Sequence, residues 1–154
     1  YHALVEPYLQ YCNIIWAGHR TSVLRELFLC QQRLMRIIAN SSRLSHSAPL
    51  FKQLSILPVY DINNLQVGCF MYSAVNRLLP QCFSSMFVTN STLHSYRTRR
   101  HNDIHQTQFR LNITKFSIRV YGALLWNSLD SEIKCLPTLS SFKNRYKQNL
   151  IASL

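Results

Sequence analysis

The segment from Asp61 to Leu79 constrains the fold most, because it is apolar on nearly every side when it is wound as a helix. Only Gln66, Ser73 and Asn76 form a thin polar stripe along it. A helix of this kind has to be covered by other elements all around its axis. Its large apolar residues are Ile62, Leu65, Val67, Phe70, Met71, Tyr72, Val75 and Leu78. The segment therefore predicts a central, buried helix with Asp61 as its N-cap.

Two further segments show helical periodicity on one face only. Residues 21–40 place apolar side chains on one face and Arg25, Arg33 and Arg36 on the other. Glu26 is the one acidic residue that offsets these positive charges. A terminal helix is expected after Pro137, and its buried stripe is Leu139, Phe142, Tyr146 and Leu150. Two interpretations of the basic face of residues 21–40 stay open: it is merely a solvated surface, or it contacts phosphates.

The later part of the chain changes in character. Residues 88–112 are rich in Asn, Ser, Thr, His and Arg, which is typical of a loop or hinge. Apolar residues then alternate between Phe109 and Val120, which predicts a short β-hairpin. The chain is thus expected to be mainly α, with a helical domain over 1–87, a basic loop or hinge over 88–112, and a small α+β segment over 113–154 that combines a hairpin with a helix.

The charge of the chain is strongly positive. Seventeen Lys and Arg oppose six Asp and Glu, which gives a formal net charge of +11. Residues 93–154 hold ten of the basic residues and three of the acidic ones, and so carry most of the excess. Such an imbalance indicates an acidic partner, either a nucleic acid or an anionic membrane surface. No apolar run in the sequence is long enough to span a bilayer, and no signal peptide is expected.

Catalysis within this chain is not expected. The carboxylates are mostly isolated, whereas a two-metal polymerase or nuclease needs several that converge. His101 and His105 have a spacing that suits a metal on a helix, but no third ligand stands at a recognised distance. The sequence therefore predicts no catalytic residue, no metal site and no cofactor. The five cysteines lack Cys-x-x-Cys spacing and are expected to be buried free thiols.

Basic residues interleaved with aromatic ones mark a candidate binding segment. Arginine and lysine can pair with phosphates, and tyrosine can stack on bases. A basic loop on an ordinary domain would look similar, so this pattern favours nucleic acid without establishing it. The candidates in this part of the chain are Tyr96, Arg97, Arg99, Arg100, Lys115 and Arg119.

Several sequence blocks resemble one family in order along the chain. They are Glu6–Cys12 with Trp16, Leu27–Ile38, Pro49–Phe51 with Leu54 and Ile56–Leu57, His94–Tyr96 with Thr98–Arg99, and Gly122 with Leu125–Leu129, Ile133–Lys134 and Phe142–Lys143. Together they resemble the region that follows the palm in non-LTR (LINE-type, Jockey-like) retrotransposon reverse transcriptases. The family usually has Pro after the Trp-Asn-Ser-Leu run, where this chain has Asp130.

The resemblance implies a helical, thumb-like domain that grips template and primer, followed by a basic C-terminal region. It implies that the catalytic aspartates and their Mg²⁺ belong to the palm upstream, so that this chain is inactive alone while its parent is an RNA-directed DNA polymerase. Because the chain starts at Tyr1 rather than Met, we expect it to be part of a longer protein.

The expected partners are RNA, an RNA–DNA duplex, and the palm and fingers of the same polyprotein, with no membrane. The expected location is intracellular, and nuclear during retrotransposition. Two alternatives remain open: a helical scaffold or protein-interaction domain, and a decayed transposon remnant without activity.

Overall fold

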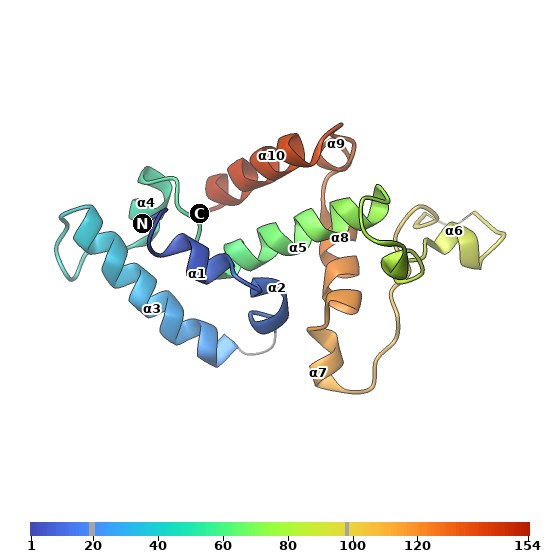
Figure 1. Ribbon diagram of the computed structural model, residues 1–154, viewed down its shortest axis with the longest axis horizontal. Helices are drawn as coiled ribbons and strands as arrows, with labels where there is room; N and C mark the ends of the chain where they lie inside the picture. Colours follow the sequence, from blue (N-terminus) through green and yellow to red (C-terminus); the bar gives the residue numbers. More distant parts are fainter. Residues whose placement is uncertain (19–20, 98) are drawn as a thin grey trace. The chain divides into compact units, whose positions relative to one another are not determined.

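The computed structural model describes residues 1–18, 21–97 and 99–154, and at residues 21–23 and 112 it describes the backbone alone. Figure 1 shows helices joined by turns, which confirms the mainly helical fold predicted from the sequence. The helices are α1 (Glu6–Gln10), α2 (Asn13–Trp16), α3 (Thr21–Ile38), α4 (Ala48–Gln53), α5 (Val59–Val75), α6 (Asn90–Leu93), α7 (Asn112–Lys115), α8 (Ala123–Ser128), α9 (Ser131–Lys134) and α10 (Leu139–Ala152). A 3₁₀ turn spans Gln81–Phe83, and a π-helical turn spans Ile118–Gly122.

The chain forms two compact units. The first comprises residues 1–66 and 143–154, and the second comprises residues 67–142. This division reflects spatial proximity, whereas the expected boundaries at 88 and 113 rest on composition. The boundaries expected from composition therefore stay a prediction.

The first unit is built around the apolar face of α3. Met35 is fully buried there and clusters with Leu50, Phe51 and Ile56 from α4 and the turn after it. Phe28 stacks on Phe51 with ring centroids 6.0 Å apart. Alternating apolar and basic positions along α3 therefore produce a one-sided core, as the helical periodicity of residues 21–40 predicts.

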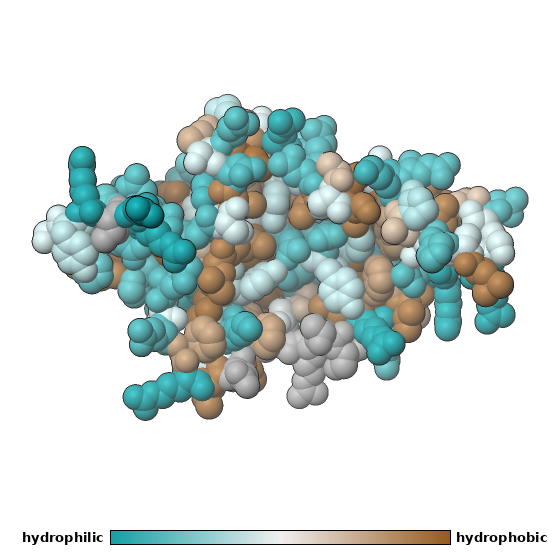
Figure 2. Space-filling model, turned by 180° about the vertical axis from the view of Figure 1, so that it is seen from behind, coloured by the Kyte–Doolittle hydropathy of each residue, from teal (hydrophilic) through white to brown (hydrophobic). Residues whose placement is uncertain are grey.

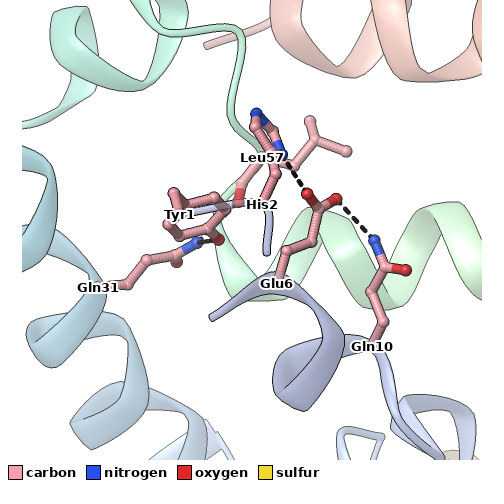
Figure 3. A network of polar contacts seen from close by, with 6 residues as sticks. All are labelled: Tyr1, His2, Glu6, Gln10, Gln31 and Leu57. Atoms are coloured by element: carbon pink, nitrogen blue, oxygen red, sulfur yellow. Dashed lines mark hydrogen bonds and ion pairs between the residues drawn. The ribbon is translucent and has the colours of Figure 1, made fainter. Parts of the chain in front are cut away.

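The start of α5 is fixed by a side chain from α3. Gln31 accepts a hydrogen bond from the backbone N–H of Val59 (2.9 Å) and donates one to the carbonyl of Leu57 (2.9 Å). It also donates to the hydroxyl of Tyr1 (2.7 Å), within the network that Figure 3 shows. Because this amide satisfies the first free N–H of the helix and Pro58 fixes the backbone before it, α5 begins at Val59.

Asp61 is therefore not the N-cap, and that expectation was wrong. Its carboxylate lies in the first turn of α5, where the helix dipole favours a negative charge. Burial raises the pKa of the Asp61 carboxyl above its ordinary value, although a hydrogen bond from Asn64 opposes the shift.

The central part of α5 is buried around its circumference, as predicted. The core residues on this helix are Ile62, Leu65, Val67, Met71 and Tyr72. The side between Ile62 and Val67 holds two buried polar residues, Asn63 and Ser73. The end of the predicted segment differs, because α5 ends at Val75 rather than near Leu79, and both Val75 and Leu78 are exposed.

In the second unit, three aromatic rings form a compact cluster. Tyr72 lies 4.8 Å from Phe142 and 6.4 Å from Trp126, measured between ring centroids, and its hydroxyl donates to the carbonyl of Leu136 (2.6 Å). Of the predicted buried stripe of the last helix, Phe142 lies in this unit and is buried in α10, whereas Leu139 is exposed. The cluster ties α5, α8 and the start of α10 together.

The predicted β-hairpin between Phe109 and Val120 is not present. The segment instead forms α7 and the π-helical turn, and the described residues hold one isolated antiparallel bridge, between Thr89 and Ile104. The buried residues that follow, Val120, Ala123 and Trp126, recur every three positions, which is helical spacing. Phe109 and Leu111 are exposed, so the apparent alternation did not mark a buried strand face.

The cysteines are free thiols, but their expected burial was wrong. Cys12, Cys30, Cys82 and Cys135 are exposed, and Cys69 is half-buried. Apolar neighbours in sequence did not imply burial here, because each neighbour turns to a different side of its helix or turn. None of the helices in the described ranges is long and apolar enough to cross a membrane.

Candidate nucleic-acid interface

Three predicted arginines project from α3. Arg25 and Arg33 are exposed, whereas Arg36 is half-buried and donates from Nε to the carbonyl of Ser45 (2.9 Å). At about 100° per residue, Arg25 and Arg36 lie within roughly 20° of each other around the axis, and Arg33 lies roughly 60° further. The three guanidinium groups therefore follow one side of the helix over three turns.

The second set of predicted residues lies in a closed surface loop. Its two ends are joined by two backbone hydrogen bonds, from the N–H of His105 to the carbonyl of Val88 (2.7 Å) and from the N–H of Asn90 to the carbonyl of Asp103 (2.9 Å). A surface loop with adjoining ends and its own internal contacts is an Ω-loop. Within it, the side chains of Tyr96, Arg97, Arg99 and Arg100 are exposed.

The loop is held to α8 by one amide. Asn127 donates from Nδ2 to the carbonyl of Ile104 (2.9 Å) and accepts the Ile104 N–H at Oδ1 (3.0 Å). Ile104 itself is buried. The loop therefore presents its arginines from an anchored base.

Tyr96 is available for stacking on its outer face. Its ring stacks on His94 with centroids 5.3 Å apart and planes 26° from parallel, and the side chain is 62% exposed. A ring supported on one side and open on the other is the arrangement that base stacking needs.

Lys115 and Arg119 lie on different elements and are both exposed. Lys115 ends α7, and Arg119 belongs to the π-helical turn. The predicted residues thus divide between the units: three belong to the first unit and six to the second.

The positive charges of these residues are not neutralised by neighbouring carboxylates. Over residues 1–18, 21–97 and 99–154 the one ion pair joins His2 to Glu6, which also accepts a hydrogen bond from Gln10, as Figure 3 shows. The same residues contain no group of three His, Cys, Asp or Glu side chains that could hold a metal ion. The chemistry that the arrangement offers is anion binding by uncompensated guanidinium groups.

Sequence reasoning missed Arg43. This arginine lies in the connector after α3 and lines a groove together with Arg33 and Arg36. The available signal was its position directly after a basic helix, in a polar run of seven residues. The sequence alone does not single it out, because the turn that brings Arg43 beside α3 is a tertiary feature.

No family model matches this chain, and comparisons with curated proteins and solved structures gave no match either.

Proposed function

We propose that this chain is a non-catalytic, nucleic-acid-binding part of the reverse transcriptase of a non-LTR retrotransposon. In this role it grips an RNA–DNA or RNA duplex through the sugar–phosphate backbone. The observation that carries the proposal is the set of exposed arginines on α3 and the Ω-loop with no carboxylate paired to them in the described structure. Arginine binds phosphate bidentately, so uncompensated arginines on a chain of net charge +11 favour a polyphosphate partner.

In this proposal, DNA synthesis is catalysed by another part of the polyprotein. The palm and fingers upstream would supply the catalytic aspartates and the Mg²⁺, and this chain would contribute binding alone. It would act inside the cell, and in the nucleus during retrotransposition.

The test is a salt titration of the binding of a fluorescently labelled RNA–DNA duplex, followed by anisotropy. The logarithm of the affinity should fall linearly with the logarithm of NaCl concentration, with a slope of about −0.9 per phosphate contacted. Replacing Arg25 and Arg33 with Gln should make that slope shallower by about 2 units. An affinity that does not change between low and physiological salt would contradict the proposal.

Arg145 on α10 provides the matched control. It is exposed and belongs to neither predicted set, so Arg145→Gln removes the same charge elsewhere. If this control lowered the slope as much per charge as the α3 variants do, the assignment of the binding face to α3 would be wrong.

A scaffold role is the second candidate, and one observation favours it. Four large apolar residues in and beside α1 and α2 are exposed, and they are Leu4, Tyr8, Tyr11 and Ile15. Figure 2 likewise shows hydrophobic residues, in brown, reaching the surface among hydrophilic ones. A protein-interaction domain would keep its partner when duplex is added, whereas the nucleic-acid proposal predicts direct and salt-sensitive duplex binding.

A further inference from the structure

The end of α3 and the connector after it form a groove. Asn40 adopts a left-handed backbone conformation (φ 47°), and the N–H of Ser41 donates to the carbonyl of Arg36 (2.9 Å). This turn ends the helix and carries the chain into the connector that holds Arg43. The resulting groove has a volume of about 590 Å³. It is lined by Arg33, Arg36, Ile37, Asn40, Ser41 and Arg43.

Three arginines and no acidic residue line this groove. Guanidinium groups gathered in one hollow repel one another, and an anion bound among them removes that repulsion. Each guanidinium presents several N–H donors in a planar fork that matches two phosphate oxygens. A phosphate group is therefore the anion that this set of donors fits best.

Arg36 is oriented before any ligand arrives. Its Nε donates to the carbonyl of Ser45, which uses one of five N–H donors and leaves the two terminal NH₂ groups. The side chain is half-buried, whereas Arg33 and Arg43 are exposed. Because one member of the set is already held in place, binding loses less side-chain entropy than three free arginines would.

The groove also has an apolar part. Ile37 is 74% exposed although it lies in a hollow whose other members are polar or charged. The volume falls within the range of sites for small organic ligands and exceeds what one inorganic ion requires. The lining therefore suits a ligand that joins a phosphate to a less polar moiety.

We propose that this groove binds one nucleotide unit. Arg36 contacts the phosphate together with Arg33 and Arg43, and Ile37 packs against the sugar or base. The proposal deepens the proposed function, because the nucleotide would belong to the bound strand, and it rests on that function for the source of the ligand. It adds Arg43 and Ile37 to the binding residues and places the contact at a defined hollow.

The test uses adenosine 5′-monophosphate, adenosine and inorganic phosphate as probes, titrated separately into the full chain and followed by NMR chemical shifts or calorimetry. The monophosphate should bind most tightly, and adenosine should bind at least about tenfold more weakly because it lacks the charge-assisted hydrogen bonds. Inorganic phosphate should bind more weakly than the monophosphate. Equal affinity for inorganic phosphate and the monophosphate would overturn the assignment to a nucleotide.

Two variants separate a built site from diffuse positive charge. Arg43→Gln changes an exposed side chain and should weaken monophosphate binding about tenfold, with the fold intact by circular dichroism. Arg36→Lys keeps the charge but loses the planar fork and the contact with Ser45, so it should weaken monophosphate binding by a similar factor. Arg145→Gln is the control and should leave this affinity unchanged. If Arg145→Gln weakened binding as much as Arg43→Gln, the groove would not be a site.

The same samples are titrated with the labelled RNA–DNA duplex, so that the two proposals can fail separately. If the chain binds duplex but not the monophosphate, and Arg43→Gln does not change the affinity for duplex, the nucleotide site in the groove is overturned and the proposed function is still supported. Monophosphate binding that depends on Arg43, in a chain that does not bind duplex, supports the groove and overturns the function.

Discussion

At the scale of single residues, Gln31 and Asn127 perform the same task in different units. Each pairs its side-chain amide with the N–H and C=O groups of a connecting segment, as a neighbouring strand would do. Gln31 pairs with Leu57 and Val59, and Asn127 pairs with both groups of Ile104. An amide is the one neutral side-chain group that donates and accepts in this geometry, so neither a carboxylate nor a methyl group replaces it.

Asn127→Asp should therefore destabilise the chain by about 2 kcal/mol. The substitution replaces the donor at Nδ2 with an oxygen that faces the carbonyl of Ile104, so a buried acceptor loses its hydrogen bond and meets a negative charge. Urea unfolding measures the change. Asn144→Asp makes the same substitution at an exposed position of α10 and should stay within about 0.5 kcal/mol of the parent chain. Equal effects of both variants would show that the Asn127 contact contributes nothing specific.

The role of these amides could not be predicted from the sequence. Both residues belong to blocks that carry the family resemblance, yet their backbone partners lie 28 and 23 residues away along the chain. Patterns of local periodicity contain no information on such pairs. The exposure of the predicted binding residues was easier to predict, because charged side chains such as arginine and lysine are mostly found on the surface. Eight of them are exposed, and Arg36 is half-buried.

At the scale of elements, three helices end without glycine. The chain contains only three glycines, and Asn40, Ser55 and Arg77 instead adopt left-handed conformations with φ of 47°, 53° and 55° after α3, α4 and α5. After each helix, the next N–H donates to a carbonyl five residues back, over distances of 2.8–3.0 Å. This hydrogen bond is the one that glycine usually completes at a helix C-terminus.

Replacing Ser55 with Gly should stabilise the chain by up to about 1 kcal/mol. A side chain with a Cβ pays about 1–2 kcal/mol in the left-handed region, and part of the gain is offset because glycine loses more entropy on folding. Arg77→Gly should behave likewise, whereas Asn40→Gly should gain less, since asparagine tolerates this region. Thermal unfolding gives the ranking. Gln53→Gly, two residues earlier at the last position of α4, is the control and should be destabilising because this residue is helical. A loss of stability in Ser55→Gly of the same size would contradict the expected gain.

The long apolar periods predicted helices correctly, whereas the short alternation between Phe109 and Val120 predicted a hairpin that is not present. Residues 21–40 and the segment after Asp61 contain several turns of consistent periodicity. Helix α3 ends within two residues of its predicted end, whereas α5 begins two residues before Asp61 and ends four residues before Leu79. Between Phe109 and Val120 the alternation covers only a few residues. It was indistinguishable from helical turns whose buried positions, Val120 and Ala123, continue into α8.

At the scale of the whole molecule, the charge is large and internally uncompensated. The formal net charge is +11, and the described residues contain a single ion pair, between His2 and Glu6. Folding brings the cationic side chains closer together than they are in the unfolded chain. Their mutual repulsion therefore lowers the free energy of unfolding, and the effect is largest at low ionic strength.

Added NaCl should consequently raise the stability of this chain while it lowers the affinity for duplex. Between roughly 10 mM and 150 mM salt the screening length falls from about 30 Å to about 8 Å, which removes most repulsion between separate surface charges. The thermal midpoint should rise by a few degrees, about the shift that 1 kcal/mol produces in a chain of this length. Sodium sulfate at equal ionic strength is the informative comparison. Screening alone predicts the same rise for both salts, whereas occupation of the groove beside α3 by sulfate predicts an extra rise that Arg43→Gln abolishes. A midpoint that falls as NaCl is added would mean that attractive ion pairs outweigh repulsion, and the uncompensated surface inferred from the arginines would then be wrong.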